Sequence, residues 1–147
     1  TTESGGGGGL SIGYCFNRTV SLYAERLGAS VKFADFSDTY TLAHFDLGVR
    51  LNFGGEARST LRFVSLAVSG RAAALDLLGS PFSIAGAGVT VDGGVAFFLN
   101  PSTSIDLRLN WTGGSFTEAE YRGVKETIDV RATAARFDIG LPWWAGR

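Results

Sequence analysis

Residues 39–53 alternate apolar and polar side chains almost without a break. One set is Ala43, Phe45, Leu47, Val49, Leu51 and Phe53, and the other is His44, Asp46, Gly48, Arg50 and Asn52. Successive side chains of a β-strand point to opposite faces, so this period of two predicts a strand with one apolar and one polar face. The run is also far longer than the roughly 5–6 residues of a common strand.

The same alternation recurs along the chain. It is clearest in residues 103–112, where the apolar set is Ile105, Leu107, Leu109 and Trp111. Residues 85–99 and 135–143 follow the same rule, and residues 10–16 and 19–25 are shorter versions. Seven strands are therefore predicted, at about 9–17, 19–31, 39–53, 58–75, 83–99, 103–114 and 125–144.

Two segments break the phase of the alternation. Leu61 and Phe63 are out of step with Val64 and Leu66, which is the effect of one extra residue inserted into a strand. The sequence predicts a β-bulge near that point and a similar slip between residues 130 and 135.

Connections between the predicted strands alternate in length. Short connections rich in turn residues lie at 17–19, 53–58 and 100–102, and longer, more polar ones lie at 30–38, 76–82 and 114–124. This order predicts an antiparallel up-and-down sheet with tight turns at one rim and loops at the other. Closing the sheet into a barrel removes its unpaired edges.

The residues of the polar face indicate whether the apolar side chains of such a barrel point inward or outward. A soluble lipocalin-like barrel buries its apolar set, whereas an outer-membrane barrel exposes that set to lipid. The predicted interior charges are Glu25, His44, Asp46, Arg50, Asp92, Asp106, Arg108, Arg136 and Asp138, with Arg62 as a further candidate. The same face carries Gly13, Gly48, Gly86, Gly88, Gly94 and Gly140. Small residues and charges of balanced sign suit a narrow, filled interior better than a solvent-exposed face.

Strand length favours the membrane interpretation. Ala43 to Phe53 spans ten residue steps, which at ~3.3 Å per residue and a tilt of ~40° cover about 25 Å of membrane normal. The predicted lipid-facing residues are Phe45, Leu47, Val49, Leu107, Leu109, Phe137 and Ile139. The predicted aromatic girdles contain Phe16, Phe53, Phe97 and Trp143 at the short-turn rim and Trp111 at the long-loop rim.

Composition agrees with a single β-rich domain. The chain has 147 residues, with 21 Gly, 3 Pro and 12% aromatic residues. Its formal charge is −1, and acidic and basic residues are interspersed, so no basic patch could follow a nucleic-acid backbone. Nucleic acid is therefore not an expected partner.

We do not expect the first residues of this sequence to be a targeting segment. The chain contains no Met and no basic, long apolar start, so we expect a processed form or a fragment whose signal peptide is absent from this sequence. The glycine run at residues 5–9 lacks the Lys and Ser/Thr of a phosphate-binding loop. Residues 1–8 are predicted to form a flexible outer loop, and residues 9–147 a single barrel domain.

Candidate chemistry is sparse. His44 is the only histidine, and no Ser or Asp partner at a diagnostic spacing marks it as catalytic. Cys15 is the only cysteine, which excludes an intrachain disulfide and favours a small interior residue. We predict no enzymatic activity, no metal site and no cofactor.

The sequence resembles the small outer-membrane β-barrel family of Gram-negative bacteria, the eight-stranded OmpA-, OmpX- and OmpW-like proteins. The resemblance runs from Gly8 to Trp144 and rests on residues 43–55, 86–111 and 132–144. It implies a location in the bacterial outer membrane, with membrane lipid as a partner.

One strand is missing from this count, because single-chain bacterial barrels close with an even number. The short turn at 17–19 makes strand 9–17 run toward the short-turn rim, where the C-terminal strand also ends. We predict that a further first strand or another polypeptide fills the gap between strands 9–17 and 125–144, and that these two strands do not pair directly.

Three functions are compatible with these features. The leading hypothesis is a structural or anchoring barrel that binds a partner through its long loops. A small-ligand conduit or a lipid-modifying barrel is the second, and a soluble lipocalin-like carrier is the third. An eight-stranded interior is about filled by its own side chains, which argues against a wide pore.

Overall fold

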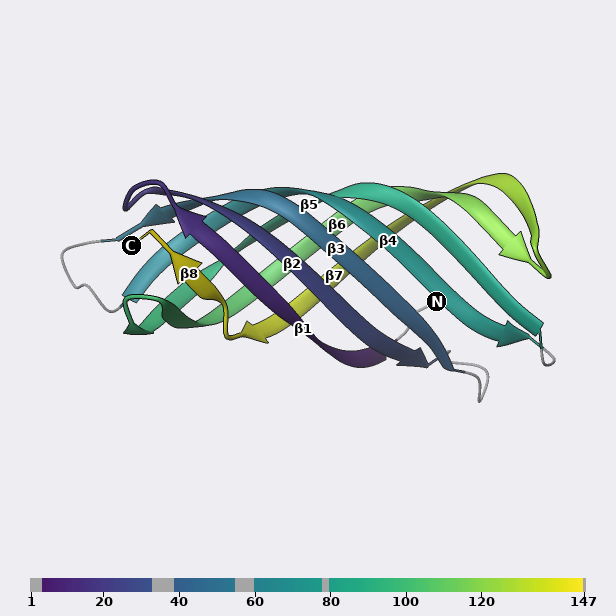
Figure 1. Ribbon diagram of the computed structural model, residues 1–147, viewed down its shortest axis with the longest axis horizontal. Coiled ribbons are helices and arrows are strands. Elements are labelled where there is room, and N and C mark those ends of the chain that lie inside the picture. The colour runs from purple at the N-terminus through teal and green to yellow at the C-terminus, as the bar shows by residue number, and fades with distance from the viewer. Residues whose placement is uncertain (1–3, 33–38, 55–59, 78–79, 147) are drawn as a thin grey trace.

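The computed structural model describes residues 4–32, 39–54, 60–77 and 80–146 (Figure 1). The all-β prediction is confirmed: eight strands form one mixed sheet whose hydrogen bonds close into a ring. The strands are β1 (Ser4–Cys15), β2 (Val20–Lys32), β3 (Thr39–Phe53), β4 (Thr60–Leu77), β5 (Ser80–Asn100), β6 (Thr103–Tyr121), β7 (Val124–Gly140) and β8 (Trp143–Ala145).

The ring closes through its shortest strand. Each strand from β1 to β6 pairs antiparallel with the next one in sequence, so that these pairings link β1 to β7. β8 pairs in parallel with β1 and meets β6 where Trp143 lies opposite Thr103. The parallel contact makes the sheet mixed, which departs from the purely antiparallel up-and-down order predicted from the sequence.

The prediction that the first and last strands do not pair directly is wrong at one end of the molecule. Ile12, Gly13 and Tyr14 lie opposite residues 143–145 of β8. The chain can shift sideways there because Pro142 has no N–H to continue the ladder of β7. Among the described residues, β7 pairs with β6 and has no ladder with β1, so the rest of this seam is open.

Two predicted turns are confirmed, and each is closed by an asparagine side chain. Asn17 Oδ1 accepts hydrogen bonds from the backbone N–H groups of Thr19 and Val20, both at 2.8 Å. Asn100 Oδ1 accepts one from Ser102 N, also at 2.8 Å. Such Asx turns are compact, so adjacent strands follow with little intervening chain.

The opposite end has strands where the sequence predicted loops. β6 and β7 continue to a two-residue turn at Arg122 and Gly123, whose φ angles of 51° and 81° match the primed turns that join twisted strands. β4 and β5 likewise extend into the predicted loop at 76–82. Residues 33–38, 78–79 and most of the predicted connection at 53–58 lie outside the described residues.

The predicted flexible loop at residues 1–8 is also wrong over its described part. Residues 4–9 belong to β1 and pair with residues 27–32 of β2. Glycines have no side chains that could alternate in polarity, so the hydrophobic pattern could not predict this part of the strand. Backbone pairing specifies it instead.

Register shifts occur at places other than those predicted. β4 keeps an unbroken register with β3 and β5, so it contains no bulge. Phe63 is instead an interior residue with only 2% of its surface exposed. The slip predicted at 130–135 lies earlier in β7, where Thr127 and Val130 lie opposite Glu118 and Phe116.

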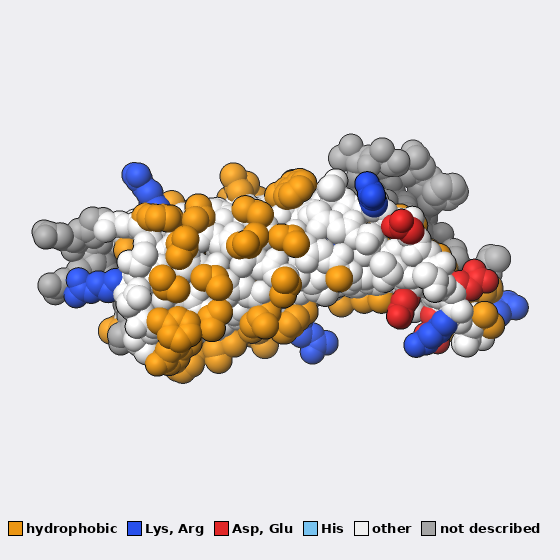
Figure 2. All heavy atoms as spheres, turned by 90° about the horizontal axis from the view of Figure 1, so that it is seen from above, with side chains coloured by type: hydrophobic (Ala, Val, Ile, Leu, Met, Phe, Trp, Pro, Cys, Tyr) orange, Lys and Arg blue, Asp and Glu red, His pale blue; other side chains and the backbone are white. Residues whose placement is uncertain are grey.

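The outer surface differs between the two ends of the molecule. Figure 2 shows hydrophobic side chains gathered over the end on the left, where the turn at residues 16–19 and β8 lie (Figure 1). Acidic side chains, together with some of the basic ones, gather at the right-hand end in this view, where β6 and β7 are joined. In the part of the chain that the structure describes, no helix is long and apolar enough to cross a membrane.

Candidate functional site

Polar and charged side chains fill the interior of the ring. Seven of the nine predicted interior residues are buried, namely Glu25, His44, Asp46, Arg50, Asp92, Asp106 and Arg108. The other two, Arg136 and Asp138, are half-buried and lie on β7. Arg62, the further candidate, is exposed and therefore does not belong to this interior set.

An arginine plug closes the interior beside β8, and we use this name for Arg50, Phe63, Asp106 and Trp144. Arg50 Nη1 lies 2.5 Å from Asp106 Oδ2. The guanidinium carbon of Arg50 lies 3.5 Å from the ring centre of Phe63 and 4.7 Å from that of Trp144. An ion pair and two cation–π contacts thus hold one cation between four strands.

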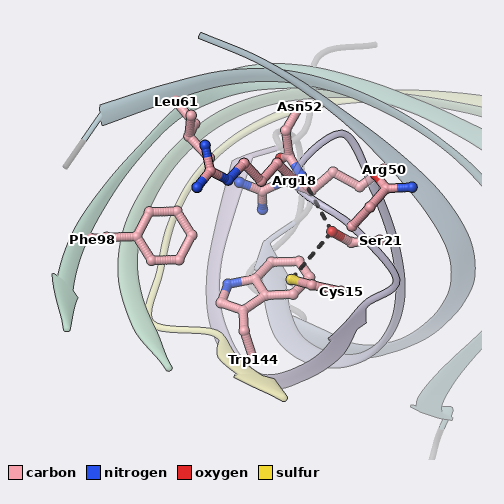
Figure 3. A pocket seen from close by; sticks show the side chains of 9 residues that line it. Cys15, Arg18, Ser21, Arg50, Asn52, Leu61, Phe98 and Trp144 are labelled. Atoms are coloured by element: carbon pink, nitrogen blue, oxygen red, sulfur yellow. Dashed lines mark hydrogen bonds between the residues drawn. The ribbon is translucent and has the colours of Figure 1, made fainter. Parts of the chain in front are cut away.

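Hydrogen bonds fix the plug in place. Trp144 Nε1 donates to Ser104 Oγ at 3.1 Å, and Ser104 Oγ donates to Asp106 Oδ1 at 2.6 Å. The cavity next to it, shown in Figure 3, has a volume of about 10 Å³ and is lined in part by Cys15, Ser21 and Trp144. That volume is at the lower limit for a single water molecule, so this cavity has no room for a larger ligand.

A second ion pair crosses the middle of the interior. Arg108 Nη2 of β6 lies 2.6 Å from Glu25 Oε2 of β2. Nearby, Asp92 accepts hydrogen bonds from Tyr23 Oη at 3.1 Å and from Ser65 Oγ at 2.7 Å. Buried charges are costly without partners, and each of these carboxylates has at least one.

His44 belongs to a hydrogen-bonded cluster of β3, β4 and β5. Its Nε2 lies 2.8 Å from Asp46 Oδ1, which also accepts a hydrogen bond from Ser69 Oγ. Ser69 in turn contacts Thr90 Oγ1 at 2.6 Å. A nucleophilic serine must donate to its general base, whereas Ser69 donates to the carboxylate. The cluster therefore holds strands together and lacks the order of a catalytic triad.

Beyond the plug, the interior is less tightly paired around Arg71 and Arg136. Arg71 Nη1 donates to the backbone oxygen of Ala132 at 3.1 Å, and its guanidinium lies 5.1 Å from the ring centre of Phe116. Arg136 Nε lies 3.7 Å from Asp138 Oδ2, which accepts a shorter hydrogen bond of 2.5 Å from Asn110. Positive charge is consequently less closely neutralised here than at the plug.

Sequence reasoning missed several interior residues. Phe63 and Arg71 lie on β4, whose phase was interpreted as bulged, and Trp144 lies on a strand that the pattern did not separate from β7. Ser69 and Thr90 are uncharged, although their inward phase next to Asp46 and Asp92 could have identified them. The alternation therefore indicated which positions face inward. Apart from glycines and Cys15, only the charged residues at those positions were assigned to the interior.

Inward-facing glycines let neighbouring strands approach closely. A Cβ on Gly48 would lie 2.7 Å from the Cβ of Ala67 and 2.9 Å from Cε1 of Tyr23. A Cβ on Gly88 would lie 2.5 Å from the backbone oxygen of Gly113 across the β5–β6 pair. The sheet can curve tightly at these positions because no side chain stands between the strands.

The outer face is apolar where the interior is charged. The predicted lipid-facing residues Phe45, Leu47, Val49, Leu109, Phe137 and Ile139 are exposed, and Leu107 is half-exposed. All five predicted girdle residues, Phe16, Phe53, Phe97, Trp111 and Trp143, are exposed as well. β6 continues for ten residues beyond Trp111 to Tyr121, so the strand extends past the predicted loop rim.

Few groups in the described chain offer reactive chemistry. Cys15 is buried and accepts a contact from Ser21 Oγ at 3.4 Å. Among the described residues, no group of three or more His, Cys, Asp and Glu side chains is placed to hold a metal ion. Comparison of the chain with protein-family models, with curated proteins and with solved structures finds no match.

Proposed function

We propose that this chain is a bacterial outer-membrane barrel with a filled polar interior, which anchors its polar end at the membrane surface for contact with a partner. One observation carries the proposal: the polarity of the fold is inverted. Arg50 and Asp106 are 3% and 1% exposed, whereas Leu109 and Ile139 are 68% and 69% exposed. A soluble protein gains stability from the opposite arrangement.

Lipid is the solvent that suits such an outer face. Exposed Leu, Val, Ile and Phe side chains recur on consecutive outward positions of β3 to β7. In water, each square ångström of apolar surface left uncovered forgoes roughly 25 cal/mol. Contact with hydrocarbon removes that cost, and the ring of hydrogen bonds satisfies most backbone groups without water.

The interior argues against the two alternative functions. A lipocalin-like carrier requires an apolar cavity, but the described interior is lined by charges, hydroxyl groups and the Arg50 plug. A conduit requires a continuous opening, but the plug end is occupied by the buried Arg50–Asp106 pair, beside a cavity of about 10 Å³. The structural and anchoring role needs neither feature.

The partner-binding part of the proposal rests on the end that carries the β6–β7 turn. Tyr121 and Val124 are exposed there beside Lys125, on a segment that replaces one of the predicted long loops. An ordered hairpin can present these side chains with little loss of conformational entropy on binding.

Lipid contact can be tested by the quenching of tryptophan fluorescence with brominated phospholipids. Trp111 and Trp143 are 54% and 49% exposed, whereas Trp144 is 2% exposed. We expect strong quenching in the wild-type protein and little in the Trp111→Phe/Trp143→Phe variant, whose remaining tryptophan lies inside. Similar weak quenching in both proteins, with the circular dichroism of a folded sheet, would overturn the membrane proposal.

Two further measurements separate this proposal from a conduit or a lipid-modifying enzyme. In planar bilayers, the filled interior should give no stable conductance steps. Lipid A incubated with the protein should keep its mass. Regular conductance steps, or a mass change that His44→Ala abolishes, would replace the structural role with one of those activities.

A further inference from the structure

The seam between β1 and β7 leaves two strand edges without neighbours. Among the described residues, β7 pairs with β6 on one side, and β1 pairs on its seam side through Ile12–Tyr14 alone. Residues 4–11 of β1 and the facing edge of β7 therefore have backbone groups outside any ladder. Such edges are templates for another strand.

Strand direction determines how one strand would fit. β7 follows β1 after six successive antiparallel pairings, so both strands run the same way. The parallel pairing of β1 with β8, which continues from β7, agrees with this direction. A single strand between them is antiparallel to both neighbours, like the long ladders elsewhere in the ring.

The inner side of the seam has space for side chains of an added strand and favours a negative charge there. Gly7 and Gly9 of β1 and Ala132 of β7 face inward and are small. Arg136, also on β7, has its Nε and Nη2 atoms buried without a hydrogen-bond partner among the described residues. Arg71 reaches the same strand, is 7% exposed, and has an unpartnered Nε. A carboxylate on the inner face of an added strand would complement these guanidiniums.

We propose that a partner polypeptide completes the ring by adding one strand between β1 and β7, antiparallel to both, with apolar side chains outward and a Glu or Asp inward beside Arg136. The inference rests on the proposed membrane function, because unpaired backbone amides cost most in lipid. Leu10 and Phe137, which are 85% and 63% exposed, flank the outward side chains of the added strand.

A second copy of this chain fits the seam less well. Joining β1 of one copy to β7 of another within one membrane would make a parallel ladder, because both strands run the same way across the membrane. The inward residues of β1 next to Arg136 would then be small or uncharged, such as Gly9 and Ser11. No carboxylate of the second copy would then reach Nη2 of Arg136, which has no hydrogen-bond partner among the described residues.

The test uses two synthetic ten-residue peptides in which outward Val and Leu alternate with inward Ser. One peptide carries an inward Glu and the other an inward Lys, and each has one Cys for disulfide trapping. The protein carries Cys15→Ser with Gly8→Cys on β1 or Thr133→Cys on β7, both outward positions. Val49→Cys is the matched control, because β3 is exposed there but paired along both edges.

We expect the Glu peptide to cross-link to the β1 and β7 cysteines and not to Val49→Cys. This cross-linking should be about tenfold faster than that of the Lys peptide, a ratio that corresponds to about 1.4 kcal/mol. Arg136→Gln should remove most of that difference. Equal trapping at all three cysteines, an intramolecular disulfide in Gly8→Cys/Thr133→Cys, or covalent dimers formed without peptide would overturn the proposal.

Vesicle flotation measured on the same samples keeps the two proposals distinguishable. Selective trapping in detergent micelles with no flotation would overturn the membrane function and support strand addition. Flotation with unselective trapping would overturn strand addition and leave the membrane function intact.

Discussion

The half of the molecule that carries the short turns and the half that carries the β6–β7 turn are built from the same strands but differ in both faces. The first half is apolar outside, with Phe53 and Trp143 exposed, and tightly ion-paired inside through Arg50 and Asp106. The second half exposes charged residues such as Glu120 and Lys125, and its interior Arg71 contacts a backbone oxygen and an aromatic ring.

This difference shows that the alternation of side chains specifies a strand but does not specify the environment of its outer face. The long strands keep their period of two over most of their length, apart from the register shifts of β5, β6 and β7. Their outward side chains nevertheless change from large and apolar to small or polar. On β6, Leu109 and Trp111 are followed outward by Gly113 and Ser115. The change places an environmental boundary across the sheet, and under the proposed function that boundary is the membrane surface.

Removing one partner of the interior ion pair should have the largest effect. Arg108→Ala leaves Glu25 buried without its cation, so we expect a loss of about 3–5 kcal/mol in the free energy of unfolding. Urea titration of the vesicle-inserted protein measures this loss. The double variant Glu25→Met/Arg108→Met should recover most of it, and a double variant as unstable as Arg108→Ala would contradict this explanation.

A charge placed on the outer face should have different effects on stability in the two halves. Leu47 is 51% exposed within the apolar half and Val124 is 62% exposed beside the β6–β7 turn. Leu47→Arg should lower the free energy of unfolding by ~2–4 kcal/mol in lipid, whereas Val124→Arg should change it by less than about 1 kcal/mol. Equal effects of the two substitutions would remove the boundary between the halves.

Much of the first half could be predicted from the sequence, because its chemistry contrasts strongly at alternate positions. The charges at 46, 50, 106 and 108 identified the interior, and their apolar neighbours identified the outer face. Phe63 was not predicted because an apolar side chain on the inward phase resembles a bulge when its contact with Arg50 is not known. Trp144 was not predicted because the pattern did not separate β8 from β7.

Little of the second half could be predicted in the same way. Outward Gly, Ser and Thr residues at 113, 115 and 117 of β6 provide almost no hydrophobic contrast, so this strand was predicted to end at residue 114 and not at Tyr121. The closure by β8 was also beyond the pattern, because parallel pairing of Ile12–Tyr14 with 143–145 depends on the register of the whole ring. Tertiary register overrides local signal in both cases.

Glycine substitutions should show that the two halves need glycine for different reasons. Gly48→Ala brings a methyl group against Ala67 and Tyr23, so we expect a loss of about 1–3 kcal/mol from overpacking. Gly123→Ala meets no atom within 4 Å but must adopt a φ of +81°, which costs about 1 kcal/mol. A smaller loss for Gly48→Ala than for Gly123→Ala, by urea titration, would indicate that the sheet relaxes at Gly48.

The smallest effect should come from the ion pair beside the β6–β7 turn. Lys125 Nζ lies 4.0 Å from Glu120 Oε2, and the two side chains are 70% and 45% exposed. Solvent screens this pair, so Lys125→Ala should change the free energy of unfolding by no more than about 0.5 kcal/mol, and less at high salt. The same urea titration at two salt concentrations checks it, with Glu120→Gln as the matched variant. A salt-independent loss as large as that of Arg108→Ala would mean that Lys125 has a buried partner and that the two halves are paired alike.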